Sequence, residues 1–167
     1  LSAADRHETP EGVSYFIDNE PEPADFLSEV LSGFSKLPKS VPPKFFYDEV
    51  GLNLFNKICK TTDYYVTRTE VGLLKAEGPE ISEQVGPSRA VIEYGCGSSL
   101  KINALLNALN SPTEYTAIDI SRGHLLQTVA EIAVAYPSLK VGAICADFSL
   151  PLNLPSHIGK GVRRLAF

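Results

Sequence analysis

Hydrophobic positions follow two different patterns before and after about residue 88. Before it, apolar residues recur at helical spacing in three stretches, which predicts helices over residues 25–34, 48–59 and 67–86. After it, short apolar runs alternate with helical patterns, which predicts strands over 90–94, 114–119, 139–146 and 162–167 and helices over 98–110 and 121–136. Strands that alternate with helices of this length form parallel sheets with right-handed crossovers. The pattern therefore predicts an α/β fold.

Changes in composition divide the chain into three expected regions. Residues 1–23 are acidic and rich in proline and glycine, with little periodicity, and are expected to form a flexible arm. Residues 24–87 form a helical region, in which three prolines make residues 36–44 an extended connector. Residues 88–167 carry the strands. The chain has no methionine and ends where a strand is just beginning, so we expect a fragment with little or no turnover of its own.

Composition narrows the class of protein. The chain has 167 residues, of which 44% are hydrophobic and 21% charged, as in a globular protein with one core. No apolar run approaches the roughly 20 residues of a membrane span, and the net charge of −5 disfavours nucleic acid as a partner. Cysteines and histidines show neither paired nor metal-ligand spacing, which predicts reduced thiols, a cytoplasmic location and no metal site. They are Cys59, Cys96, Cys145, His7, His124 and His157.

A glycine turn follows the first of these strands. Residues 90–94 run directly into Gly95-Cys96-Gly97, and a predicted helix begins just after. Glycines allow backbone N–H groups to approach a ligand that a Cβ would hold away. In an open parallel sheet, ligands bind beyond the carboxyl ends of the strands. Three successive strands carry an acid at or near that end, namely Glu93, Asp119 and Asp147.

The spacing of these acids favours an adenosine compound. Asp119 follows Gly97 by roughly 20 residues, the separation at which an acid accepts ribose hydroxyls. Asp147-Phe148 offers an acceptor for the adenine amino group and an apolar ring for its face. A dinucleotide is the main alternative, but Leu100 occupies the place of its third glycine. S-adenosylmethionine needs no pyrophosphate site and fits better, although each feature alone is also common in helix caps and ordinary loops.

Several motifs resemble those of a known family. Glu93-Tyr94-Gly95-Cys96-Gly97 resembles the first motif of class I methyltransferases, which have a Rossmann-like core. Three front-half segments closely resemble the histidine-specific N-methyltransferases, and the resemblance runs from Phe26 to Phe167. These segments are Lys39–Asp48, Leu54-Phe55 and Tyr64–Glu70. The family uses S-adenosylmethionine to trimethylate the α-amino group of L-histidine to hercynine in ergothioneine biosynthesis. The resemblance thus implies a small amino acid as substrate.

The resemblance also implies roles for individual residues. The cofactor contacts of the family match Gly95, Lys101, Asp119, Asp147 and Phe148. Tyr64 matches a residue that binds the substrate imidazole, and Tyr47 matches a tyrosine that could orient the substrate amine. Ordinary aromatic packing is the alternative for both tyrosines, and no residue is identified as the catalytic base.

One departure from the family pattern keeps alternatives open. The family continues past the last strand to an asparagine, a tyrosine, a glutamate and a serine that complete the amino-acid pocket, and this chain does not reach them. The chain could therefore be a fragment that only binds the cofactor, or the enzyme could act on another amino acid or an indole amine.

Thr67 and Glu70 have capping-box spacing, so Arg68 and Glu70 are expected to be structural.

Overall fold

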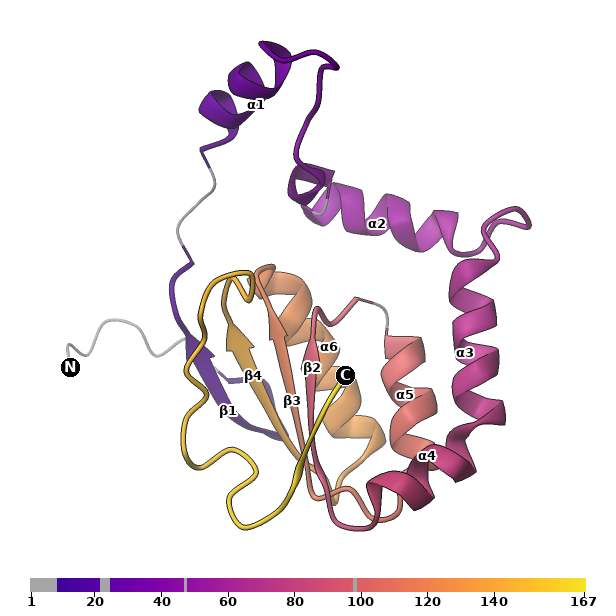
Figure 1. The fold of residues 1–167 in the computed structure, drawn as a ribbon. Helices are drawn as coiled ribbons and strands as arrows, with labels where there is room; N and C mark the ends of the chain where they lie inside the picture. The colour runs from indigo at the N-terminus through magenta and orange to yellow at the C-terminus, as the bar shows by residue number, and fades with distance from the viewer. Residues whose placement is uncertain (1–8, 22–24, 47, 98) are drawn as a thin grey trace, which may run out of the picture.

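A parallel sheet organises the part of the chain that the computed structural model describes, residues 9–21, 25–46, 48–97 and 99–167. Within that part, five strands pair in the order β1-β4-β3-β2-β5, and every neighbouring pair is parallel (Figure 1). The strands are β1 Val13–Asp18, β2 Ala90–Tyr94, β3 Glu114–Asp119, β4 Lys140–Cys145 and β5 Arg164–Ala166. The predicted α/β fold with a parallel sheet is confirmed.

The helices fall into two groups. Two of them, α5 Ser99–Ala108 and α6 Arg122–Ala135, are the crossovers of the sheet. The others precede β2, and α3 packs against α5 while α2 lies on the side of the carboxyl ends of the strands (Figure 1). They are α1 Phe26–Phe34, the short 3-10 helix η1 Pro43–Phe46, α2 Glu49–Ile58, α3 Val66–Ala76 and α4 Gly78–Val85.

The two faces of the sheet are covered differently. One face packs against α5 and α6 and forms the larger core, which includes Val91, Tyr115 and Leu125. The other face carries Ile92, Ile118 and Ile144, which pack under the loop between β4 and β5 through Ile158. Because both faces are covered, most residues of the central strands are buried, including the polar side chains of Glu93, Glu114 and Thr116.

The strand order reverses direction at β2. The chain proceeds from β2 to β3 and β4 on one side, and returns to place β5 on the other side of β2. Such a reversal leaves a crevice beyond the carboxyl ends of the strands, where ligands bind in open α/β sheets. The glycine turn that follows β2 lies at this point (Figure 1).

The prediction of a flexible arm over residues 1–23 was wrong for residues 13–18, which form β1 at the edge of the sheet. The Tyr15 hydroxyl donates to Glu114 Oε1 at 3.0 Å and shares a 2.5 Å hydrogen bond with Thr116 Oγ1. The Tyr15 ring also occupies the space where Gly142 lacks a side chain. These partners are about a hundred residues away, so local composition did not reveal the strand. Residues 1–8 lie outside the described part.

The single helix predicted over residues 67–86 is two helices. Its interruption at Glu77 precedes Gly78-Pro79, and Pro79 occupies the first turn of α4, where a missing N–H costs little. The capping box is also absent from the start of α3, since the N-cap residue is Tyr65 and it makes no side-chain cap. In contrast, Asp48 caps α2 by accepting from the Gly51 N–H at 2.7 Å.

Candidate functional site

The glycine turn is held open by its backbone conformation. Gly95 has φ +84°, a value that disfavours any residue with a side chain. Its N–H donates to the Ile118 carbonyl at 2.8 Å, which fixes the turn to the end of β3. A Cβ at Gly95 would lie 3.5 Å from Phe148 Cζ, so the turn and the Phe148 ring face each other directly. The structure therefore brings together two of the predicted cofactor residues.

Two predicted acids lie at the same edge of the sheet. Asp119 ends β3 and its Oδ1 accepts from the Ser121 N–H at 2.8 Å. Asp147 follows β4, and its Oδ1 accepts from Ser149 N–H at 2.9 Å and from Ser149 Oγ at 2.6 Å. The hydrogen bonds from Ser149 lower the pKa of Asp147 below its ordinary value, so this carboxylate is ionised at neutral pH. Each side chain is oriented by its own loop, as a hydrogen-bond acceptor at a ligand site needs to be.

Glu93 differs from the other two acids. Its side chain is buried in the core, and its Oε2 accepts from the Tyr115 hydroxyl at 2.5 Å. Burial raises the pKa of Glu93 to about 7, while the Tyr115 hydrogen bond and the Lys101 charge oppose the rise. The sequence grouped Glu93 with two acids expected to face a ligand, but in the structure its side chain is buried and bonded to Tyr115.

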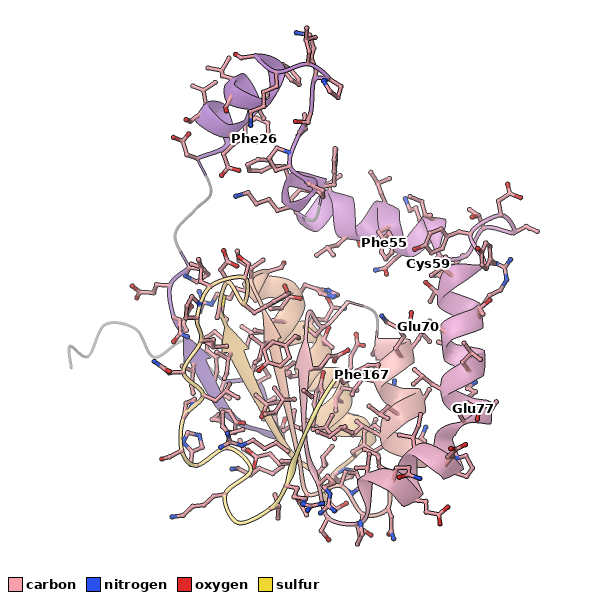
Figure 2. All side chains as sticks on the ribbon, viewed as in Figure 1. Phe26, Phe55, Cys59, Glu70, Glu77 and Phe167 are labelled. Atoms are coloured by element: carbon pink, nitrogen blue, oxygen red, sulfur yellow. The ribbon has the colours of Figure 1, made fainter. Side chains whose placement is uncertain are left out.

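The side chain of Lys101, in α5, reaches toward α3. Its Nζ is 3.3 Å from Glu70 Oε1, and both side chains are partly exposed (Figure 2). It stands in the first turn of α5, immediately after the glycine turn, and its charge acts on buried Glu93. Glu70, expected to be structural, forms an ion pair with the predicted cofactor lysine and does not cap α3.

Of the two predicted substrate tyrosines, the structure describes Tyr64 but not Tyr47. Tyr64 is half-buried in the α2–α3 loop, and its ring packs edge-on against Phe55 at a centroid distance of 5.8 Å (Figure 2). Arg68 orders this loop, because its Nη1 donates to the Thr61 carbonyl at 3.0 Å and to the Tyr64 carbonyl at 2.9 Å. Tyr47 lies outside the described residues. Tyr64 therefore makes the aromatic packing contact that the alternative predicted, in a loop that Arg68 links through two carbonyl groups.

His124 contacts the turn and was missed by sequence reasoning. Its Nε2 lies 3.0 Å from the Cys96 carbonyl oxygen and 2.6 Å from the Gly97 carbonyl oxygen. The partners are backbone atoms, which leave no trace in a sequence. The available signal was only the position of a histidine in the first turn of the helix that follows Asp119.

A cavity of about 680 Å³ adjoins the turn on the α6 side. It is lined by Asn56 of α2, by Cys59 just after that helix, by Gly97 of the turn, and by Ser121 and His124 at the start of α6. Gly95 and Phe148 are not among the residues that line it.

Two negative observations apply to the described part of the chain. It contains no group of three or more His, Cys, Asp or Glu side chains that could hold a metal ion. None of its helices has the length and apolar character that crossing a bilayer requires.

Comparison with known proteins gives a family match and named relatives. A family described as "Histidine-specific methyltransferase, SAM-dependent" matches residues 26–167. Histidine N-alpha-methyltransferases of Mycolicibacterium smegmatis and Mycobacterium tuberculosis are each 36% identical, over 135 and 140 residues, which is 79% and 82% of this chain. A 4-dimethylallyltryptophan N-methyltransferase of Claviceps purpurea is 33% identical over 107 residues, 62% of this chain and 31% of that protein. The chain spans about 42% of the length of the two histidine enzymes.

Proposed function

Because the chain belongs to the histidine-specific, S-adenosylmethionine-dependent methyltransferase family, we propose that the protein carrying it methylates the α-amino group of L-histidine. Three transfers would give hercynine, the trimethylated product. The observation that carries the proposal is the cradle at the carboxyl end of β2, where Gly95 faces Phe148, while Asp119 ends β3 and Asp147 follows β4. The two mycobacterial relatives named histidine N-alpha-methyltransferase support the choice of substrate.

The residues of the cradle fit S-adenosylmethionine chemically. The sulfonium group of this cofactor supplies an activated methyl group to a nucleophile. Asp119 offers a carboxylate to the ribose hydroxyls, and Asp147 with Phe148 offers an acceptor and an aromatic face to the adenine. The absence of a Cβ at Gly95 leaves room in front of the Phe148 ring. The ammonium group of Lys101 suits the carboxylate of the cofactor.

The helical region is proposed to receive the amino acid. We assign residues 24–87 to the substrate side and residues 88–167 to the cofactor side. Tyr64 is proposed to bind the imidazole and Tyr47 to orient the amine. A protonated amine has no lone pair to donate, so the site has to favour the neutral form, and it has to exclude water from the reacting atoms.

Two alternatives follow from specific observations. The relative that is named for 4-dimethylallyltryptophan makes another amino acid or an indole amine a second candidate substrate. The share of about 42% of the relatives' length makes cofactor binding without turnover a second candidate activity for the 167-residue chain. The net charge of −5 argues against nucleic acid as a partner. Three free cysteines support a reducing, cytoplasmic location.

A methylation assay tests the proposal. The natural protein that carries this sequence is incubated with S-adenosylmethionine and a panel of amines that includes histidine, tryptophan and 4-dimethylallyltryptophan, and the products are identified by mass spectrometry. We expect histidine to gain up to three methyl groups. Methylation of an indole amine with histidine unchanged would overturn the proposal that histidine is the substrate. Cofactor binding without any methylation would mean that the protein binds the cofactor but does not transfer its methyl group.

A further inference from the structure

His124 joins helix α6 to the glycine turn through two backbone oxygens. Its Nε2 is 3.0 Å from the Cys96 oxygen and 2.6 Å from the Gly97 oxygen. A carbonyl oxygen can only accept a hydrogen bond, so both contacts require a hydrogen on Nε2. We infer that His124 is a positioning residue for the cofactor, which fixes the glycine turn in the conformation that receives S-adenosylmethionine. The inference rests on the proposed function.

The turn needs such a constraint because of its composition. Gly95 and Gly97 flank Cys96, and glycine loses more backbone freedom on ordering than any other residue. Two hydrogen bonds use donors of the turn itself, from the Gly95 N–H to the Ile118 carbonyl at 2.8 Å and from the Gly97 N–H to the Gly95 carbonyl at 2.9 Å. His124 complements them, because it holds two of the carbonyls of the same turn. Orienting a peptide carbonyl also orients the N–H on the opposite side of that peptide plane.

His124 is itself fixed at the start of α6. The next residue, Leu125, is fully buried, and its N–H donates to the Ser121 carbonyl at 2.9 Å. The Ser121 N–H in turn donates to Asp119 Oδ1 at 2.8 Å. The acid proposed to bind the ribose and the turn proposed to accept the cofactor are therefore connected through one helix start. Fixing one relative to the other before the ligand arrives reduces the entropy cost of binding.

The competing explanation is that His124 has a purely structural role. The position of its side chain allows an experiment to distinguish this role from a positioning role. The imidazole lines the cavity of about 680 Å³ and is only half-buried, so its replacement does not remove a core side chain. A structural role predicts lower stability with unchanged cofactor affinity. A positioning role predicts weaker affinity and a looser turn in a protein that remains folded.

The test compares four variants of the natural protein. His124→Phe keeps a ring without the donor, His124→Asn shortens the donor so that it cannot reach, and His124→Gln keeps an N–H near the place of Nε2. Gln127→Ala is the matched control, because Gln127 is on the same helix, lines the same cavity and bonds instead to Glu131. Calorimetry measures S-adenosylmethionine affinity, and amide hydrogen exchange without cofactor measures the mobility of the turn around Cys96.

We expect His124→Phe and His124→Asn to bind about tenfold more weakly, the change that loss of one hydrogen bond of roughly 1.4 kcal/mol gives. The turn amides should exchange faster in both, and His124→Gln and Gln127→Ala should resemble the unaltered protein. Affinities equal to that of the unaltered protein in both weakening variants would overturn the inference and leave the proposed function standing. Failure of the unaltered protein to bind S-adenosylmethionine would overturn the proposed function and the inference with it. If His124→Phe fails to fold, the Asn and Gln pair decides.

Discussion

Tyr115 donates a 2.5 Å hydrogen bond to Oε2 of Glu93, inside the core and beside the glycine turn. The pair joins β3 to β2 through side chains, in addition to the backbone pairing of the two strands. Burial raises the pKa values of both groups, that of Glu93 to about 7. Because the pKa of this buried carboxyl group is raised on folding, we expect the free energy of unfolding to depend on pH.

The first prediction concerns this pH dependence. Below pH 4.5 Glu93 is protonated in both the folded and the unfolded state, and the carboxyl group favours neither. Between pH 4.5 and about 7 the unfolded chain releases this proton first, so the free energy of unfolding falls as pH rises. The loss amounts to at most about 3 kcal/mol. We expect urea unfolding to show this loss in the unaltered protein and not in Glu93→Gln.

The comparison depends on the change with pH rather than on absolute stability, because the amide of Glu93→Gln has its own hydrogen-bonding needs. Glu83→Gln, at an exposed position of α4, serves as the control and should keep the pH dependence of the unaltered protein. Identical pH profiles for Glu93→Gln and the unaltered protein would show that Glu93 does not carry the effect.

Sequence reasoning succeeded where the signal was local. The strands predicted over residues 90–94, 114–119 and 139–146 agree closely with β2, β3 and β4, whose apolar side chains pack on both faces of the sheet. It failed for β1, whose place depends on the fit of Tyr15 over Gly142. A contact between residues so far apart in the chain is not visible in either segment alone.

The site shows the same division. The glycine turn and the acids at the ends of β3 and β4 were visible because each is fixed by its own strand and loop. The hydrogen bond of buried Glu93 was not visible, because its donor, Tyr115, lies on the neighbouring strand. His124 was missed because its partners are backbone oxygens, which any residue at positions 96 and 97 would supply.

The second prediction contrasts the two glycines of the turn. Gly95→Ala should cost about 1–2 kcal/mol of unfolding free energy, because φ +84° strains a residue with a side chain while the added Cβ meets the Phe148 ring only at an ordinary 3.5 Å. Gly97→Ala should instead raise the unfolding free energy by about 0.4–1 kcal/mol, since its Cβ meets nothing within 4 Å and alanine reduces the freedom of the unfolded chain. Urea unfolding of both variants measures the difference, and equal costs would refute the strain argument.

The third prediction tests the aromatic side of the cradle. Phe148 is 44% exposed and Leu150 in the same loop is 63% exposed, so truncating either to alanine should leave the melting temperature nearly unchanged. Phe148→Ala should weaken S-adenosylmethionine binding about three- to tenfold, the value of one aromatic contact. Leu150→Ala should bind normally. Calorimetry on the natural protein decides, and unchanged affinity in Phe148→Ala would place the adenine elsewhere.

The last prediction concerns the attachment of β1. Gly142 has no Cβ, and any Cβ there would overlap the ring of Tyr15. Gly142→Ala should therefore cost about 3 kcal/mol or more, because ring and backbone must move apart. Tyr15→Ala should also be costly, since it removes the ring and the hydrogen bonds of its hydroxyl to Glu114 and Thr116.

The double variant separates steric overlap from a general effect of replacing glycine. With Tyr15→Ala in place, Gly142→Ala has nothing to overlap and should cost little more, so the cycle should show a coupling of about 2–3 kcal/mol. Gly72→Ala in α3 is the control, because its Cβ meets nothing within 4 Å and alanine favours a helix by about 1 kcal/mol over glycine. Additive costs for Tyr15 and Gly142 in urea unfolding would mean that β1 is not held by this contact.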